Sequence, residues 1–252
     1  MAAYYNENDP KTAAWLRELI KARLIADGEV DTRSIIDVQP ADLAGFVQCH
    51  FFAGIGGWSQ GLRLAGWRDE WPAWTGSCPC QPWSSAGKGA AASDPRHLWP
   101  AWFRLIQERC PGRIFGEQVA SADGRAWLDV VCDDLEACNY AVGPVDFPAC
   151  GIAAPFRRSR LWFVADSGRA GLPERSALQR SARTPPAPSA WREFERVHGE
   201  DAWARWDAES EVRVFAYGLS NVGGRLRGFG NSVSPYHAAE VIAAYMELSD
   251  DR

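Results

Sequence analysis

Apolar residues in the middle of the chain alternate between short runs typical of strands and longer stretches with helical spacing. The expected strands are 46–52, 71–75, 113–116, 140–147 and 160–165. Between them, apolar residues recur at three- and four-residue intervals, which predicts helices over 58–65, from about 94 to 109, and over 123–138. This alternation of strand and helix indicates an α/β fold.

Each end of the chain adds one predicted helix. Asp9 can cap the first helix, Pro10 is tolerated at its first position, and Gly28 is the expected stop. The closing helix begins at Pro235 and ends at about Leu248. Residues 166–222 differ in kind: they are rich in Arg, Ser and Glu and contain a proline cluster, which indicates an insert or a small lobe.

Composition restricts the class of protein. With 252 residues, of which 46% are hydrophobic, the chain can form one large domain with a substantial core. No uninterrupted apolar window is long enough for a membrane span, and the first residues do not resemble a secretory signal. Seven cysteines without an export signal indicate reduced thiols, so we expect a cytoplasmic protein with no membrane partner.

Charge is distributed unevenly along the chain. The formal net charge of −5 argues against wholesale binding of polyanions. However, residues 157–183 hold seven arginines against two acidic residues. This stretch is either a surface that follows phosphates or a solvated loop.

The segment 76–89 places Cys78 and Cys80 in a loop directly after a predicted strand, where chemistry is common. Structural zinc needs cysteine pairs separated by two to four residues and a second pair elsewhere. Here one residue separates the two cysteines and there is no second pair, so we expect no metal site. The remaining alternatives are a nucleophile and a buried hydrophobic residue.

A nucleophilic cysteine needs a partner that handles protons. Glu117 follows another short predicted strand, and a buried glutamate with a raised pKa can donate a proton to a ring nitrogen. Arg158 and Arg160 stand at the start of a further strand, where they could orient a carbonyl-bearing group. Taken singly, each of these side chains could equally be an ordinary surface residue.

Strand 46–52 runs into a glycine-rich turn and then into a helix. This arrangement lets a nucleotide-like ligand approach bare backbone at a helix N-terminus, although it is also found in ordinary tight turns.

Five segments taken together resemble the DNA (cytosine-5) methyltransferases. They are similar to that family's cofactor loop, catalytic loop, proton-donor strand, arginine strand and closing segment, and they are Phe52–Gly57, Pro79–Ser84, Gly116–Val119, Pro155–Arg160 and Gly230–Val233. The resemblance covers most of the chain outside 166–222. It implies a Rossmann-like class I S-adenosylmethionine-dependent methyltransferase sheet with a small target-recognition insert.

The resemblance also implies a mechanism in which a methyl group passes from S-adenosylmethionine to C5 of a cytosine in double-stranded DNA. The cytosine is flipped out of the duplex, because its ring cannot be reached inside it. The thiolate of Cys80 adds to C6, Glu117 protonates N3, and Arg160, with Arg158 nearby, holds the base. Cys78 is a bystander. A base then removes the C5 proton and the cysteine leaves.

The remaining site residues are also implied by the resemblance. Those expected around the cofactor are Glu7, Asn8, Ser34, Phe52, Ala53, Gly54, Ile55, Gly56, Gly57, Pro79, Asn231 and Ser232. Those expected at DNA are Gln81, Ser84, Ser85, Lys88, Arg225 and Arg227.

The chain departs from the family's pattern between the two loops. Only residues 61–75 separate them, which is too short for the family's unit of an acid-ended strand, a helix and a turn. Residues 5–10 resemble the acidic strand end, and 34–38 resemble the turn that follows it. The resemblance therefore implies a circular permutation that puts this unit before the glycine turn. The alternative is that residues 1–45 form a helical appendage without a site role.

In the permuted arrangement, Glu7 accepts hydrogen bonds from the ribose hydroxyls and Asn8 lies beside the adenine. Ser34 stands where the family has the aspartate that binds the adenine amine, and Asp31 is a possible substitute.

The expected domains are a catalytic cofactor-binding domain at 1–165, with its permuted unit at 1–45, and a target-recognition region at 166–222. Residues 223–252 return to the catalytic domain. We expect a monomer on double-stranded DNA that reads a short sequence, in a bacterial or phage-infected cell. Three roles stay open: restriction-modification, phage protection and regulation. The alternatives are an RNA cytosine-5 methyltransferase, a catalytically silent DNA-binding protein, and transfer of a group other than methyl.

Overall fold

The computed structural model describes residues 2–79, 98–152, 158–169 and 233–249. Among these residues, the strands form one sheet in the order β2-β1-β3-β4-β5-β7-β6. The strands are β1 (Ala3–Asn6), β2 (Gly28–Asp31), β3 (Gln48–Phe51), β4 (Ala73–Gly76), β5 (Arg113–Val119), β6 (Ala141–Pro148) and β7 (Ser159–Asp166). The α-helices are α1 (Pro10–Lys21), α2 (Gly57–Leu64), α3 (Trp99–Arg109), α4 (Ala122–Ala137) and α7 (Pro235–Ser249). Short 3-10 helices are η1 (Pro40–Leu43), η2 (Ala149–Ile152) and η3 (Ser167–Arg169).

The strand order confirms the predicted Rossmann-like α/β fold. Strands β2, β1, β3, β4 and β5 are parallel, and β7 is antiparallel to both of its neighbours. Counted from β3, the parallel strands read 3-2-1-4-5, the order of doubly wound nucleotide-binding sheets. β1 and β2 hold positions two and three of that order although they precede β3 in the chain. Residues 1–45 are therefore part of the sheet, and the alternative of a helical appendage is wrong.

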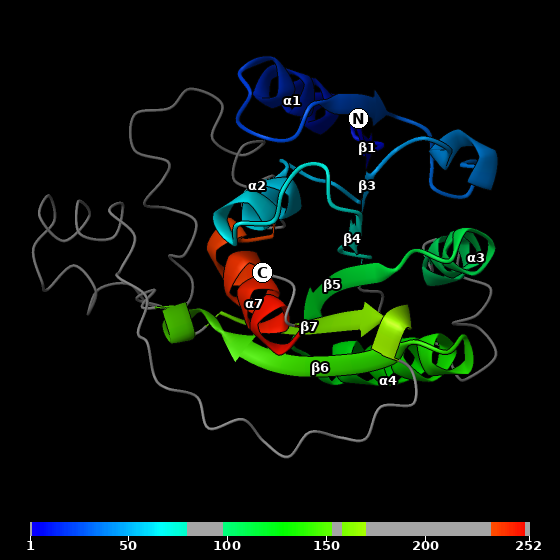
Figure 1. Ribbon diagram of the computed structural model, residues 1–252, viewed down its shortest axis with the longest axis vertical. Coiled ribbons are helices and arrows are strands. Elements are labelled where there is room, and N and C mark those ends of the chain that lie inside the picture. The colour runs from blue at the N-terminus through cyan, green and yellow to red at the C-terminus, as the bar shows by residue number, and fades with distance from the viewer. Residues whose placement is uncertain (1, 80–97, 153–157, 170–232, 250–252) are drawn as a thin grey trace, which may run out of the picture.

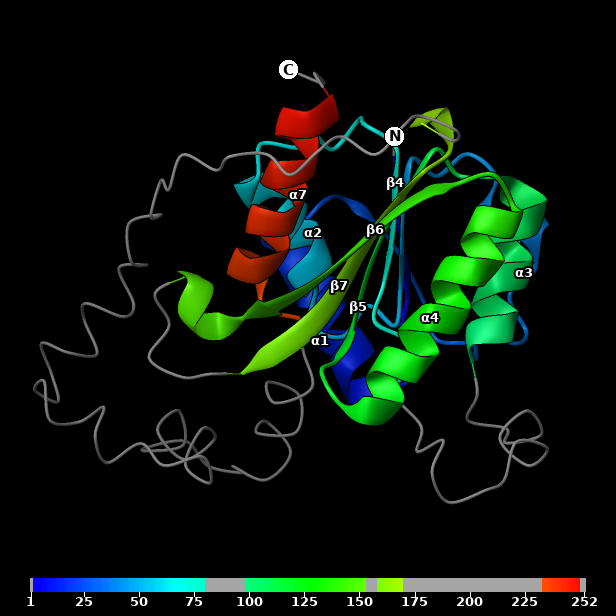
Figure 2. The same ribbon diagram turned by 90° about the horizontal axis from the view of Figure 1, so that it is seen from below.

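Helices cover both faces of the sheet (Figures 1 and 2). α1, α2 and α7 lie on one face, and α3 and α4 lie on the other. Successive strand residues supply the two cores: Tyr4 belongs to the cluster with α3 and α4, and Tyr5 packs against α1. Buried tryptophans fill much of both cores, which explains the unusual number of tryptophans in the chain. None of the helices among these residues has the length and apolarity that crossing a membrane requires.

The first helix ends earlier than the sequence predicted. It stops at Lys21, and Gly28 instead begins the edge strand β2. A Cβ on Gly28 would lie 2.0 Å from the carbonyl oxygen of Ala3, so the close pairing of β2 with β1 requires glycine there. The pattern analysis missed β2 because its four residues, Gly-Glu-Val-Asp, include a single large apolar side chain and are too few for a strand pattern to stand out.

The other expected elements are present with bounds shifted by a few residues at most. β5 runs past its expected end, through Glu117 to Val119, because Val119 still pairs with Arg160 in β7. Asp94, the expected cap of the third helix, lies outside the described residues, and the described helix α3 begins at Trp99. The same holds for residues 170–222 of the expected recognition lobe, so its bounds stay a prediction.

Gly116 carries a prediction about stability. A Cβ at this position would lie 2.0 Å from the ring of Phe163, which is fully buried and packs near Trp102 and Trp127. Because that ring has no room to move, Gly116→Ala should lower the free energy of unfolding by about 1–3 kcal/mol. Denaturant unfolding measures this change. Gly143→Ala is the matched control, because a Cβ on that strand residue meets nothing within 4 Å. Equal stability of the two variants would contradict the packing described here.

Candidate active site

The predicted site residues lie at one edge of the sheet. Asp31, Asn6, Phe51, Gly76 and Gly116 form a row of paired positions across the five parallel strands. The residues after this row therefore meet at the carboxyl edge of the sheet, where ligands bind in doubly wound folds. They are Glu7 after β1, the glycine turn after β3, the start of the cysteine loop after β4, and Glu117 in β5. β7 begins at the same edge because it is antiparallel, and its start supplies Arg158 and Arg160.

The glycine turn connects β3 to the N-terminus of α2. Three of its residues have positive φ angles: Phe52 (52°), Gly54 (55°) and Gly56 (83°), of which Gly56 is the N-cap. A Cβ on Gly54 would meet only the Phe52 carbonyl oxygen, at 4.0 Å, so the space beside this backbone is open. A Cβ on Gly57 would instead lie 2.4 Å from the carbonyl oxygen of Val233. The end of the closing segment thus packs against the first turn of α2.

Glu7 joins the N-terminal unit to the glycine turn. Its Oε2 accepts a hydrogen bond from the backbone N–H of Gly54 at 2.8 Å, and its Oε1 accepts one from the N–H of Asp9 at 2.9 Å. A carboxylate has about four acceptor sites, so two contacts leave capacity for ligand hydroxyls. The fold therefore brings together Glu7 and the glycine turn, as the permuted arrangement predicted.

The two residues considered for the adenine amine differ in their contacts. The Asp31 carboxylate accepts hydrogen bonds from the Tyr4 hydroxyl and from the guanidinium and backbone N–H of Arg33. Ser34 is half-buried, and its Oγ accepts from the N–H of Ile36 at 3.4 Å. Asp31 is thus already engaged inside the protein, whereas Ser34 retains the capacity for a further contact. Asn8, which follows Glu7 directly in the sequence, is exposed.

Glu117 is a buried acid next to a fixed positive charge. Its residue is 8% exposed, and its Oε1 accepts a hydrogen bond from Nε of Arg160 at 2.8 Å. Burial raises the pKa of Glu117 above its ordinary value, and the charge of Arg160, a hydrogen bond from Ser77 and the charge of Arg158 oppose that rise. A carboxyl group in this setting can remain protonated at higher pH than an exposed one, as proton donation to a ring requires.

The start of the cysteine loop is fixed to the neighbouring strand. The carbonyl oxygen of Cys78 accepts a hydrogen bond from Nε2 of Gln118 at 3.0 Å. The Cys78 residue is 3% exposed and belongs to the hydrophobic core, so the prediction that it packs inside is confirmed. Pro79, which is exposed, is the last described residue of the loop.

Nine of the predicted site residues lie outside the described residues, so the structure does not place them. Cys80 follows directly after Pro79 and lies outside the described residues. So do the other loop residues and the expected C-terminal site residues, namely Gln81, Ser84, Ser85, Lys88, Arg225, Arg227, Asn231 and Ser232. The roles of all of them stay predictions.

Three residues at this edge were given no role by the sequence analysis. Gln118 fixes the loop, and Ser77 and Trp58 form a hydrogen bond, from the indole Nε1 to the Ser77 Oγ, at 3.0 Å. The sequence signal for this pair is a general one: a buried tryptophan N–H usually finds a hydrogen-bond partner, but the sequence does not say which residue supplies it.

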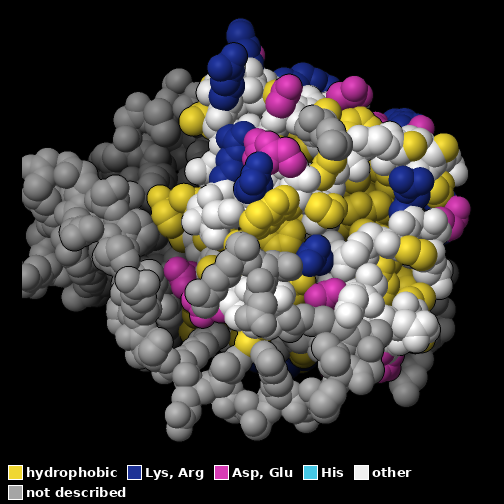
Figure 3. All heavy atoms as spheres, in the orientation of Figure 1, with side chains coloured by type: hydrophobic (Ala, Val, Ile, Leu, Met, Phe, Trp, Pro, Cys, Tyr) yellow, Lys and Arg dark blue, Asp and Glu magenta, His cyan; other side chains and the backbone are white. Residues whose placement is uncertain are grey.

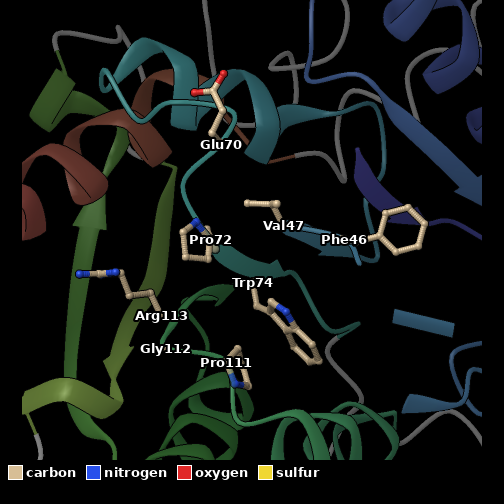
Figure 4. A pocket seen from close by; sticks show the side chains of 9 residues that line it. Phe46, Val47, Glu70, Pro72, Trp74, Pro111, Gly112 and Arg113 are labelled. Carbon is tan, nitrogen blue, oxygen red and sulfur yellow. The ribbon is translucent and has the colours of Figure 1, made fainter. Parts of the chain in front are cut away.

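A pocket of about 300 Å³ lies at the opposite edge of the sheet, away from these residues. Its walls include Val47, Pro72, Trp74 and Pro111, whose side chains are shown from close by in Figure 4. On the face of the molecule seen in Figure 3, hydrophobic side chains gather near the middle, with charged ones around them. Because this pocket lies at the amino ends of β3, β4 and β5, it is not part of the candidate site.

Comparison with known proteins agrees with the site. Residues 71–190 match the family model described as "C-5 cytosine-specific DNA methylase". Among curated proteins, the chain is 30% identical over 132 residues to Type II methyltransferase M.HgiBI of Herpetosiphon aurantiacus, covering 36% of this chain and 30% of that protein. It is 26% identical over 164 residues to Type II methyltransferase M.HgiCII of the same organism, covering 49% and 38%. The matched part thus spans less than two fifths of the length of either relative.

Solved structures give weaker likenesses. The S. pombe Dnmt2 methyltransferase is 11% identical with a TM-score of 0.49, covering 98% of this chain and 99% of that chain. The Spodoptera frugiperda DNMT2 mutant is 14% identical with a TM-score of 0.45, covering 75% and 57%. Residues 71–190, slightly less than half of the chain, thus resemble the C-5 cytosine-specific DNA methylase family, and the matched part includes the strands that carry Glu117 and Arg160.

Proposed function

We propose that this protein transfers a methyl group from S-adenosylmethionine to C5 of a cytosine that is flipped out of double-stranded DNA. The observation that carries the proposal is the buried Glu117 carboxyl group, held by Arg160 beside the start of the Pro-Cys-Gln loop. The match of residues 71–190 to the methylase family model supports the reaction class. Because the chain covers less than two fifths of the curated relatives, the activity itself is proposed here for this chain.

The proposed chemistry begins at the cysteine. Cytosine C5 is a poor nucleophile, and addition of the Cys80 thiolate to C6 makes the C5–C6 electron pair available at C5. Glu117 donates its proton to N3 as negative charge develops on the ring, which lowers the barrier to this addition. Arg160, with Arg158 beside it, holds the carboxyl group and supports the carbonyl of the base.

When bound, S-adenosylmethionine would supply the electrophilic methyl group that C5 takes, and S-adenosylhomocysteine would be released. A base then removes the C5 proton, the ring regains its double bond, and the Cys80 sulfur leaves as a thiolate. Three protein groups thus divide the work: a nucleophile, a proton donor and a base-holding cation.

The residues at the glycine turn fit the proposed cofactor. The open space beside Gly54 admits a ligand to the backbone at the N-terminus of α2, and the Glu7 carboxylate at that turn can accept ribose hydroxyls. Ser34 is the better candidate for the adenine amine, because Asp31 is already bonded to Tyr4 and Arg33. Asn8 would lie beside the adenine. The other residues proposed to line this ligand are Phe52, Ala53, Ile55, Gly56, Gly57, Pro79, Asn231 and Ser232.

Glu7→Ala should weaken binding of S-adenosylmethionine. The substitution removes the acceptor for the ribose and the carboxylate that holds Gly54, so we expect the dissociation constant to rise by about 10- to 100-fold. Titration calorimetry measures the constant directly. Glu29→Gln is the matched control, because Glu29 is exposed on the adjacent strand β2. If Glu7→Ala binds as tightly as this control, the permuted unit does not hold the ribose.

Methyl transfer with a labelled cofactor tests the proposed activity. Purified protein, S-adenosylmethionine carrying a labelled methyl group, and either duplex DNA or tRNA are incubated, and the product bases are separated. We expect 5-methylcytosine in DNA. Label in tRNA alone would favour the RNA enzyme, and DNA binding without transfer would favour the silent binding protein.

The substrate contacts and organisation are further parts of the proposal. Residues 166–222 would read the target, and a lobe of this size can contact few base edges, so we expect a recognition sequence of about two to four base pairs. Gln81, Ser84, Ser85, Lys88, Arg225 and Arg227 would contact the DNA. The enzyme would act as a monomer.

A further inference from the structure

We propose that Ser77 is a positioning residue for Glu117 and that Trp58 fixes the direction of its hydroxyl group. The inference rests on the proposed function, in which Glu117 is the proton donor. It adds Ser77 and Trp58 to the site. Their role is to orient the Glu117 carboxyl group and to set how strongly that group holds its proton.

The sheet places Ser77 next to Glu117. Gly76 and Gly116 are paired neighbours in β4 and β5, so the residues that follow them are adjacent at the same edge. Ser77 is half-buried, and its side chain forms a hydrogen bond with the Glu117 carboxyl group. The carboxyl group thus has two side-chain partners, Ser77 and the Arg160 guanidinium, whose Nε lies 2.8 Å from Oε1.

Trp58 decides which way the Ser77 hydroxyl points. The indole N–H can only donate, so the Ser77 oxygen must be the acceptor in their 3.0 Å hydrogen bond. The hydroxyl proton is therefore left for the carboxylate of Glu117. The three groups form a directed chain from indole to hydroxyl to carboxylate, in which every donor has an acceptor.

The indole itself cannot rotate away. Trp58 is 1% exposed, and its ring lies 5.4 Å from the ring of Trp162 and 6.5 Å from the ring of Phe115, measured between centroids. Phe115 is in the strand of Glu117, and Trp162 is the residue paired with Glu117 across β5 and β7. The indole N–H of Trp58, the first donor of this hydrogen-bonded series, is thus held in place by β5, which carries Glu117, and by β7, which carries Arg160.

This arrangement has a consequence for the proton on Glu117. A hydrogen bond donated to a carboxylate stabilises its charged form, so Ser77 opposes the rise in pKa that burial causes. Without the hydroxyl group, Glu117 should keep its proton to higher pH. Its carboxyl group would also lose one of the two contacts that orient it toward the base.

Ser77→Ala tests the inference through the pH dependence of methyl transfer. We expect the alkaline limb of the kcat profile to move upward by about half to one pH unit, and kcat near neutral pH to fall by about 3- to 10-fold, with KM for DNA unchanged. Ser77→Thr keeps the hydroxyl group and should restore the limb of the unmodified protein.

Trp58→Phe keeps an aromatic ring in the core but removes the donor. This substitution should move the alkaline limb of the kcat profile in the same direction as Ser77→Ala, by a smaller amount. Combined with Ser77→Ala it should cause no further shift, because Trp58 acts only through the Ser77 hydroxyl group. Trp67→Phe is the matched control. It also removes an indole N–H from the same hydrophobic cluster, but that group donates to the carbonyl of Trp71. It should affect stability without moving the limb.

A titration that needs no activity separates this inference from the proposed function. In protein with ¹³C-labelled glutamate side chains, the Glu117 signal is assigned by its absence from Glu117→Gln. Its midpoint should move upward in Ser77→Ala. An unchanged midpoint and an unchanged limb would overturn the role of Ser77, while absence of methyl transfer by the unmodified protein would overturn the proposed function alone.

Discussion

Cys80→Ala is expected to abolish both methyl transfer and the covalent complex with DNA. The proposed reaction forms a bond between this sulfur and C6, and alanine has no group that can replace it, so the rate should fall by at least about a thousandfold. DNA containing 5-fluorocytosine makes the loss visible. Fluorine at C5 cannot leave as a proton, so the unmodified protein should remain attached in the presence of the cofactor. The complex is measured as a band of reduced mobility in a denaturing gel.

The neighbouring cysteine supplies the matched control. Cys78 is buried in the core and its contact with Gln118 is made by its backbone carbonyl, which a side-chain substitution leaves in place. Cys78→Ala should therefore form the covalent complex, with at most a modest loss of stability. A covalent complex that persists in Cys80→Ala and disappears in Cys78→Ala would show that Cys78, and not Cys80, is the nucleophile.

Glu117→Gln is expected to lower kcat by about 10²- to 10⁴-fold while leaving cofactor binding intact. Glutamine has the same shape and can still accept the hydrogen bond of Arg160, but it has no acidic proton to give to N3. Single-turnover methyl transfer at saturating DNA isolates this chemical step from binding.

The pH dependence of this step has a definite sign. Burial raises the pKa of Glu117, and the proposed role needs the protonated form. The protonated fraction falls as the pH rises through that pKa, so the rate of the unmodified protein should decline on the alkaline side, and Glu117→Gln should lack that limb. Glu108→Gln on α3, whose acid is exposed and paired with Arg104, is the control and should retain the limb. A Glu117→Gln rate within about tenfold of the control would exclude proton donation by Glu117.

Much of the fold could be predicted because its central strands are buried on both faces. The middle residues of β7, for example, read as a continuous apolar run, which is typical of a strand buried on both faces. The edge strand β2 could not be found this way, since it has four residues and none of them is buried. Its place follows from pairing with β1, which is a long-range property of the sheet.

The site shows the same division. Glu117 and Arg160 were singled out separately from their positions at strand starts and ends, and the ion pair between them is a finding of the structure that the sequence did not predict. Ser77 and Trp58 were missed because their hydrogen bond joins two elements 19 residues apart, and neither residue type indicates a role by itself. That Glu7 belongs beside the glycine turn was inferred only through the family's motifs, since residues 47 positions apart show no local pattern, and its hydrogen bond with Gly54 is seen only in the structure.

The central claim is methylation of cytosine C5 in DNA, and sequencing of methylated sites tests it most directly. DNA from cells that express the unmodified protein or Cys80→Ala is treated so that 5-methylcytosine is distinguished from cytosine, and it is then sequenced. The account predicts methylated cytosine within one short recurring sequence, present with the unmodified protein and absent with Cys80→Ala. DNA without methylated cytosine in cells that contain the folded, unmodified protein would contradict it.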